Sequence, residues 1–134
     1  MLSNHVSRVA LVALALVLGV ATAAPASSLV DTAPDPSGKY RTADGYVVFA
    51  VDDAGRVQGF FEKAGMFGQL SGTLVNGAIE GRWHAESGIQ TCESAYQGAK
   101  SWGAFQFRVD DQGTLQGSMG QCEQKPVERW DGCL

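Results

Sequence analysis

One pattern that occurs twice decides the fold: Phe49-Ala-Val-Asp-Asp-Ala-Gly-Arg-Val-Gln-Gly59 and Phe107-Arg-Val-Asp-Asp-Gln-Gly-Thr-Leu-Gln-Gly117. In each copy alternating apolar residues flank Asp-x-Gly, which is typical of a β-hairpin with a three-residue loop whose glycine is left-handed. Counting from this loop places Val51 opposite Val57, so that one face of the hairpin is apolar and the other polar. The repeated stretch therefore predicts two antiparallel hairpins with the same register.

The chain around these hairpins has the same character. Asn76-Gly77 is a strong signal for a two-residue type I′ turn, and we find no sustained helical periodicity after the N-terminal region. Strands are expected at 39–42, 46–51, 56–62, 69–75, 78–84, 102–109, 114–119 and 127–130. We predict an all-β fold, a single small antiparallel up-and-down meander of about eight strands, closed or nearly closed into a barrel. Because the first and last strands are weak, an open half-barrel or a two-sheet sandwich is the alternative.

Glycine recurs inside the predicted strands, where it normally weakens a sheet. Gly59 lies opposite Phe49, and Gly117 lies opposite Phe107. A phenylalanine ring can fold across the site that a glycine leaves vacant. This spacing is typical of a tightly coiled sheet that closes on itself.

The first 23 residues have the features of a secretory signal peptide. A weakly basic start is followed by an apolar run over 9–20 and by Ala21-Thr22-Ala23, a small-x-small cleavage signature. The run is shorter than the approximately 20 residues that span a bilayer, which favours a signal peptide. An uncleaved membrane anchor is the alternative. Residues 24–37 are rich in Ala, Pro and Ser and predict a flexible linker, and 38–134 form the β-barrel-like domain. We expect a mature protein in the periplasm or the medium of a bacterium.

The charge of the predicted mature chain is acidic. Removal of Arg8 leaves 9 basic and 14 acidic residues, a net charge of −5. A chain of this charge is unsuited to nucleic acid and has no polybasic patch for a membrane surface.

The meander places successive connections at alternate ends. The minimal turns at 53–55, 76–77 and 111–113 fall at one end, and the longer connections at 63–68, 85–101 and 120–126 fall at the other. Because binding residues are most often carried by loops, a ligand or partner is expected at the long-loop end.

Three cysteines remain after the predicted cleavage, and an exported protein normally oxidises a pair. Cys92 and Cys122 fall in two connections at the long-loop end, whereas Cys133 follows the last strand and falls at the other end. We therefore predict a Cys92–Cys122 disulfide, which would stabilise the fold by roughly 3 kcal/mol by closing a loop of about 30 residues. A Cys122–Cys133 bridge is the alternative. With the first pairing, Cys133 could link two copies into a dimer.

Carboxylates, cysteines and histidine do not form a recognisable metal or catalytic motif. Asp52-Asp53 and Asp110-Asp111 open tight turns, where aspartate is favoured for local hydrogen bonding, and the alternate spacing of calcium ligands is absent. No Cys-x-x-Cys pair accompanies His84, so neither a metal nor another cofactor is predicted. His84 with Glu80 could serve a hydrolase, but no nucleophile motif frames them.

The connection 85–101 is longer than most in compact domains, and such loops are usually functional or disordered. Its aromatic residues, with those of the neighbouring connection, could form an apolar rim that grips a protein or a small apolar ligand. The alternative is that they plug the barrel mouth. The residues predicted to bind the ligand or partner are Met66, Phe67, His84, Tyr96 and Trp102.

Several short motifs of the chain carry a resemblance: Gly45-Tyr-Val-Val-Phe49, Gly72-Thr-Leu-Val-Asn-Gly77, Gly81-Arg-Trp83 and Trp130-Asp-Gly132. They resemble the glycine-rich meanders of small exported bacterial proteins, mostly of unassigned function, and more distantly avidin-like and lipocalin-like barrels. The resemblance implies a calycin-like barrel with a ligand or partner at its open end. The constellation of a biotin site is not matched.

The function expected from these observations is that of a non-enzymatic exported binding module acting through the long-loop end, with an inhibitor-like role included in this class. A small periplasmic hydrolase using His84 and Glu80 is one alternative. An envelope structural protein dimerised through a free cysteine is the other.

Overall fold

The computed structural model describes residues 34–88 and 90–134, so the predicted signal peptide and most of the predicted linker lie outside the described residues. The described part is all-β and contains no helix. Its strands are β1 (Gly38–Thr42), β2 (Gly45–Val51), β3 (Arg56–Lys63), β4 (Met66–Val75), β5 (Ala78–Ala85), β6 (Ser101–Val109), β7 (Thr114–Met119), β8 (Glu128–Arg129) and β9 (Gly132–Cys133). This part of the chain accordingly has no helix that could reach across a bilayer.

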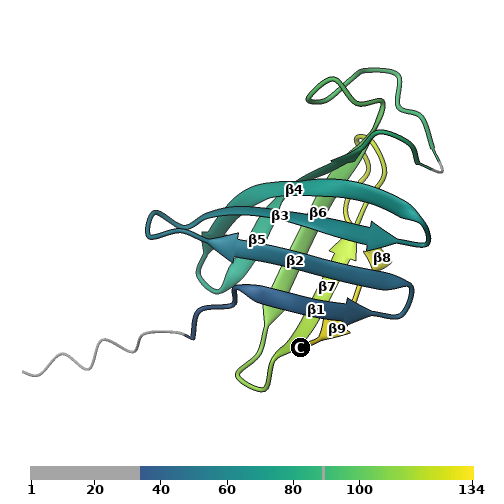
Figure 1. The fold of residues 1–134 in the computed structure, drawn as a ribbon. Helices are drawn as coiled ribbons and strands as arrows, with labels where there is room; N and C mark the ends of the chain where they lie inside the picture. The colour runs from purple at the N-terminus through teal and green to yellow at the C-terminus, as the bar shows by residue number, and fades with distance from the viewer. Residues whose placement is uncertain (1–33, 89) are drawn as a thin grey trace, which may run out of the picture. The chain divides into compact units, whose positions relative to one another are not determined.

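The strands form a closed antiparallel barrel, as predicted. Each strand from β1 to β7 pairs with the next along the chain, and β9 closes the ring because it pairs with both β7 and β1. β8 pairs with β7 alone and is an extra strand beside the eight-stranded barrel. Figure 1 shows β1 to β4 crossing in front of β6 and β7, with the connections at opposite ends of the strands.

The predicted hairpin registers are confirmed. Val51 pairs with Val57, Val109 with Leu115, and Leu74 with Ile79. The loop glycines Gly55 and Gly113 have φ angles of 77° and 78°. A residue with a side chain adopts such angles only with strain.

The first aspartate of each Asp-Asp pair holds its turn. Asp52 Oδ1 accepts hydrogen bonds from the backbone N–H groups of Ala54 and Arg56, each at 2.9 Å. Asp110 Oδ1 accepts the equivalent bonds from Gln112 and Thr114. The predicted role of these carboxylates in turn chemistry is confirmed.

The predicted long connection at 63–68 is wrong. β3 runs on to Lys63 and β4 begins at Met66, so only Ala64 and Gly65 form the turn, with φ angles of 51° and 82°. Alanine is an uncommon residue in the left-handed region, so the sequence carried no turn signal of the Asn-Gly kind. The long connections are therefore two, at 86–100 and 120–127.

The predicted last strand at 127–130 is also wrong in its bounds. It is divided into β8 and β9, with Trp130 and Asp131 between them. The Trp130 N–H donates to the Gly117 carbonyl at 2.8 Å, but the Gly117 N–H donates to Asp131 Oδ1 at 3.1 Å. A side-chain oxygen thus takes the place of a main-chain carbonyl, and the ladder is interrupted without leaving the Gly117 N–H unpaired.

Large side chains fill the inside of the barrel. The fully buried set is dominated by aromatic residues, among them Trp83, Trp130, Tyr40, Phe61, Phe105 and Phe107. Phe61 meets Trp83 and Trp130 edge to face, with ring centroids 5.9 and 5.1 Å apart. This geometry is favourable for aromatic quadrupoles, so the interior is a packed core.

Inward-facing glycines make room for these rings. A methyl group at Gly117 would overlap the ring of Phe107, and one at Gly68 would overlap the ring of Phe61. The predicted packing of an aromatic ring across a glycine is therefore confirmed at Gly117.

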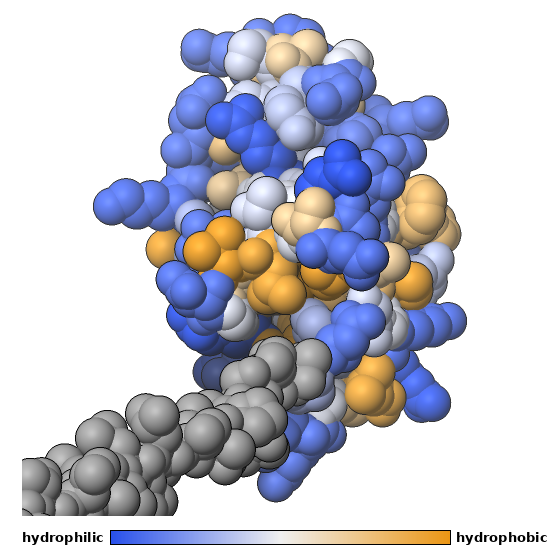
Figure 2. Space-filling view, turned by 90° about the vertical axis from the view of Figure 1, so that its left-hand side faces the viewer, coloured by the Kyte–Doolittle hydropathy of each residue, from blue (hydrophilic) through white to orange (hydrophobic). Residues whose placement is uncertain are grey.

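The end with the short turns is closed by apolar residues. Val51, Leu74 and Val109 are partly buried against the core, whereas Val75 and Leu134 are exposed. Figure 2, viewed from the left-hand side of Figure 1, shows apolar residues gathered in one region among hydrophilic ones. The chain enters the barrel at this end, where the Val51 N–H donates to Ser37 Oγ at 2.9 Å.

The predicted disulfide is confirmed. Cys92 and Cys122 are bonded, with Cα atoms 5.5 Å apart, and join the two long connections at one end of the barrel. Cys133 is free and exposed, and pairs with Thr114 at the other end. The alternative Cys122–Cys133 bridge is therefore not formed.

Replacement of Gly117 by alanine is expected to lower the free energy of unfolding by about 1–3 kcal/mol, because the new methyl group must displace both the Phe107 ring and the Trp130 carbonyl oxygen. Urea unfolding followed by tryptophan fluorescence measures this change. The neighbouring exposed residue provides the control, since Gln116→Ala should change stability by less than about 0.5 kcal/mol. Equal effects of the two substitutions would contradict the packing of Phe107 over this glycine.

Removal of the disulfide in the double variant Cys92→Ser, Cys122→Ser is expected to cost about 3 kcal/mol, because a 30-residue separation is no longer fixed in the unfolded chain. Guanidinium unfolding of the variant and of the wild type gives the difference. Cys133→Ser, which alters only an exposed thiol, should unfold like the wild type. A double variant as stable as wild type would show that the bridge contributes nothing.

Candidate functional site

The main cleft lies on the outside of the barrel at the long-loop end. It has a volume of about 810 Å³ and is bounded by the outer faces of β3, β4 and β5 on one side and by the 86–100 loop on the other. The loop projects beyond the ends of β5 and β6 at the top of Figure 1. The residues that line the cleft include Phe60, Phe67, Gln69, His84, Glu86 and Lys100.

The floor of the cleft follows from strand register. Phe60 pairs with Gln69, and Gln69 pairs with His84, so these side chains form one row across three strands. Phe67 precedes Gln69 by two residues and is therefore a diagonal neighbour of Phe60, at a typical distance of about 7–8 Å. Phe60 and Phe67 are 61% and 63% exposed. Two large aromatic side chains on one outer face are unusual unless they are covered by something else.

The wall of the cleft is a loop with a defined internal structure. Tyr96 and Ala99 exchange two backbone hydrogen bonds of 2.9 Å across Gln97-Gly98, which makes a small hairpin. The Cys92 N–H donates to the Lys100 carbonyl at 2.7 Å, and the disulfide ties Cys92 to the neighbouring loop. Because its ends and its tip are bonded, this wall is held in place before any partner arrives.

Aromatic stacking holds the loop against the barrel. The Tyr96 ring lies 5.8 Å from His84 and 6.0 Å from Trp102, and the Arg82 guanidinium lies 5.2 Å from the Tyr96 ring and 5.4 Å from the Trp102 ring. Such cation–π contacts favour a fixed arrangement of all members. The Trp102 Nε1–H donates to the Ser94 carbonyl at 2.8 Å, which fixes the loop at a second point.

The five residues predicted as a binding rim are thus divided by the structure. Phe67 and His84 line the cleft, and Tyr96 stands behind it against His84. Trp102 is 3% exposed and anchors the loop. Met66 is 8% exposed and belongs to the core, because it is adjacent to Phe67 in a strand and points to the opposite face.

Sequence reasoning missed Phe60, Gln69 and Lys100 as cleft residues. Phe60 and Gln69 would have been found from the β3–β4 register, but that register depends on the Ala64-Gly65 turn, which had no sequence signal. Lys100 is placed by the Cys92–Lys100 backbone hydrogen bond inside the loop. Its ammonium group donates to the Glu93 carbonyl of the same loop at 2.8 Å, and this course of the loop has no signal in the sequence.

The mouth of the barrel is filled from inside. Met66 lies beneath Gly88, where an added Cβ atom would be 3.1 Å from the methionine sulfur and would overlap Ser101. Three clefts lined by residues of the described part lie on the outer surface of the barrel. A ligand at the long-loop end would therefore meet the outer cleft.

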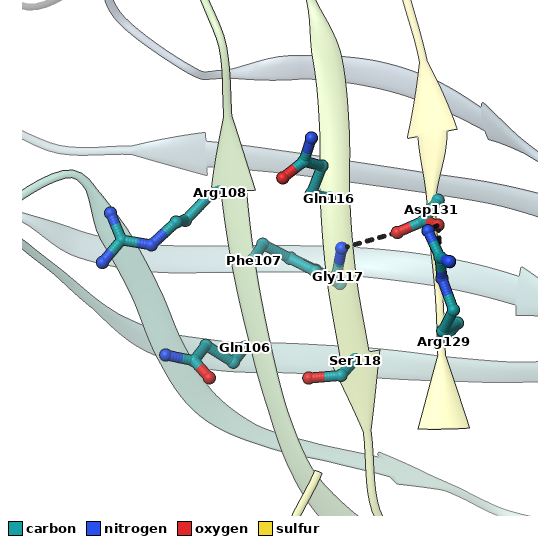
Figure 3. A pocket seen from close by; sticks show the side chains of 8 residues that line it. All are labelled: Gln106, Phe107, Arg108, Gln116, Gly117, Ser118, Arg129 and Asp131. Carbon is teal, nitrogen blue, oxygen red and sulfur yellow. Dashed lines mark hydrogen bonds and ion pairs between the residues drawn. The ribbon is translucent and has the colours of Figure 1, made fainter. Parts of the chain in front are cut away.

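A smaller cleft of about 310 Å³ lies on the outer face of β6, β7 and the β8–β9 segment. In Figure 3 Gln106 and Arg108 point away from the pair formed by Arg129 and Asp131. Arg129 Nη2 donates to Asp131 Oδ2 at 2.6 Å, while Asp131 Oδ1 accepts the Gly117 N–H. Arg129 and Asp131 thus bond within the seam where the barrel closes, and their presence in this cleft is accounted for by the closure of the barrel.

Hydrogen bonding lowers the pKa of Asp131. The Gly117 N–H contributes most and Arg129 contributes next, because both favour the charged carboxylate.

Replacement of Asp131 by asparagine is expected to destabilise the barrel at pH 7 and to have less effect in acid. A carboxylate whose pKa is lowered on folding stabilises the native state above its ordinary value of 3.8, and this contribution is lost as the pH falls through the lower, folded value. Urea unfolding of both proteins at pH 7 and near pH 3 measures the gap. A gap of the same size at both pH values would contradict the assigned role.

The two residues named for the hydrolase alternative are far apart. Glu80 and His84 lie four residues apart on β5, a separation of about 13 Å at 3.3 Å per residue. Glu80 Oε1 accepts a hydrogen bond from Gln106 Nε2 at 3.0 Å. Within 34–88 and 90–134, no three His, Cys, Asp or Glu side chains form a group that could hold a metal ion.

Comparison with known proteins gives no relative: no family model, no curated protein and no solved structure matches this chain.

Proposed function

We propose that this protein is an exported, non-enzymatic binding module whose binding surface is the outer cleft at the long-loop end. The observation that carries the proposal is the pair of exposed phenylalanines, Phe60 and Phe67, lying opposite a wall that is fixed by a disulfide. A preformed wall reduces the ordering cost of binding. The two rings provide the apolar area that a partner can bury.

The packed interior supports an outer site. Calycin-like barrels suggest a ligand inside the lumen, but here Met66, Trp83 and Phe61 occupy that space. A wholly apolar small molecule is also poorly suited to the cleft, since Gln69, His84 and Lys100 line it beside the rings. Covering these polar groups without hydrogen bonds would cost about 1–3 kcal/mol for each.

The enzyme alternative receives less support from the same geometry. Glu80 is bonded to Gln106 and is far from His84 along the strand. General acid–base catalysis needs its groups within hydrogen-bond reach of one reacting atom, and this pair does not meet that requirement.

A structural role through a dimer has one supporting observation, the exposed free thiol of Cys133. This residue lies at the end opposite the cleft, because it pairs with Thr114 beside the β6–β7 turn. A disulfide-linked dimer would therefore leave both clefts open. Non-reducing electrophoresis of the exported protein distinguishes the dimer from the monomer.

Replacement of Phe67 by alanine is expected to weaken partner binding by about tenfold or more, because burial of a phenylalanine contributes about 1.5–3 kcal/mol. The immobilised protein is incubated with the periplasmic and secreted material of its own source, and the eluate is analysed for protein and for sugar. Tyr96→Ala, which removes the support of the wall, should weaken capture as well.

Val75→Ala provides the control for this experiment, since Val75 is 60% exposed at the other end of the same strand. It should capture the same material as the wild type. An eluate that is unchanged for Phe67→Ala and Tyr96→Ala would remove the cleft from consideration.

A further inference from the structure

We infer that the occupant of the cleft is a neutral carbohydrate chain, an inference that rests on the proposed binding function. The cleft combines three properties on one surface: exposed aromatic side chains, a surrounding set of hydrogen-bonding side chains, and no excess of either charge. A sugar ring has the matching properties. Its C–H groups form an apolar face, and its hydroxyl groups surround that face.

The aromatic part of the match concerns Phe60 and Phe67. Because these residues are diagonal neighbours on β3 and β4, their rings lie on one continuous surface. The face of an aromatic ring is electron-rich and attracts polarised C–H groups. Two such rings give consecutive sugar units a place to stack.

The polar part of the match concerns the residues around the rings. Gln69 and His84 continue the floor next to Phe60, and Ser87, Glu86 and Lys100 border it. Amide, imidazole and hydroxyl groups supply donors and acceptors, and a sugar hydroxyl is both at once. An apolar ligand would leave these groups unpaired.

The charge of the cleft favours a neutral ligand. Among the lining residues Glu86 supplies one carboxylate and Lys100 one ammonium group, and this ammonium group already donates to the Glu93 carbonyl at 2.8 Å. An acidic polymer would need an excess of positive charge, and a basic peptide would need the reverse. With one charge of each sign, the lining favours neither an acidic polymer nor a basic peptide.

The closed barrel disfavours an extended peptide as the occupant. Peptides often bind by adding a strand to a free sheet edge, but β3, β4 and β5 are each paired on both sides. The cleft floor therefore offers side chains rather than main-chain hydrogen-bonding groups. Recognition through stacked rings and side-chain hydrogen bonds is the mode that this surface supports.

Sedimentation with insoluble polysaccharides tests the inference. The wild-type chain is mixed with three insoluble neutral polysaccharides, namely cellulose, chitin and a β-1,3-glucan, and the bound fraction is measured as a function of polysaccharide concentration. We expect retention on at least one of them. The double variant Phe60→Ala, Phe67→Ala should bind that polysaccharide at least tenfold more weakly, Gln69→Ala should bind it more weakly than wild type, and Val75→Ala should bind it like the wild type.

Thermal unfolding checks that the variants are folded, which we expect because both phenylalanines are largely exposed. Retention on none of the three polysaccharides, or equal retention of the wild type and the double variant, would overturn the carbohydrate inference. Capture of a protein that is lost in the same double variant, without any retention on polysaccharide, would overturn it while leaving the proposed function standing. If the double variant loses neither polysaccharide binding nor protein capture, both the carbohydrate inference and the proposed function are contradicted.

Discussion

The packing of aromatic rings over glycines inside a small barrel is the constraint on which the rest of the structure depends. Gly117 lies under Phe107 and Gly68 lies under Phe61, and neither site has room for a methyl group. A narrow barrel must bend its strands strongly, and glycine permits both the bend and the close approach of a ring. The result is an interior filled by Trp83 and its neighbours, and for this reason the proposed binding site lies on the outer surface.

Closure determines where that outer surface lies. β9 has only two residues, yet it pairs with β7 on one side and β1 on the other. Asp131 maintains the seam where the ladder is interrupted, by accepting the Gly117 N–H. Because the ring is closed and each strand reverses direction, both long loops emerge at one end, where the disulfide joins them and holds the wall of the cleft.

Much of this architecture could be predicted from the sequence because it depends on local turn chemistry. Asp-x-Gly and Asn-Gly define their loops, and period-two alternation then gives the register. The alternation of ends was sufficient to pair Cys92 with Cys122. The predictions failed where the local signal was weak, at the Ala64-Gly65 turn and at the Trp130-Asp131 interruption.

The candidate site was predicted less well for a related reason. His84 was found because it precedes a long loop, and Phe67 because the 63–68 segment was interpreted as a long connection. Phe60 required the register of a hairpin with no recognisable turn. Met66 was assigned to the rim because the same hairpin was read as a loop, and in a strand it points inward. The loop itself is organised by Tyr96, Arg82 and Trp102 through stacking contacts that have no sequence spacing of their own.

The central claim is that the outer cleft, and not the seam or the core, meets the partner molecule. Assigned aromatic and side-chain amide NMR spectra, recorded while a retained polysaccharide fragment or captured partner is added, test it most directly. Binding at the outer cleft is expected to shift the signals of Phe60, Phe67, Gln69 and His84 and to leave those of Trp83 and Trp130 unchanged. Shifts concentrated instead at Gln106 and Gln116 would place the binding surface on the outer face of β6 and β7 and contradict a site at the outer cleft.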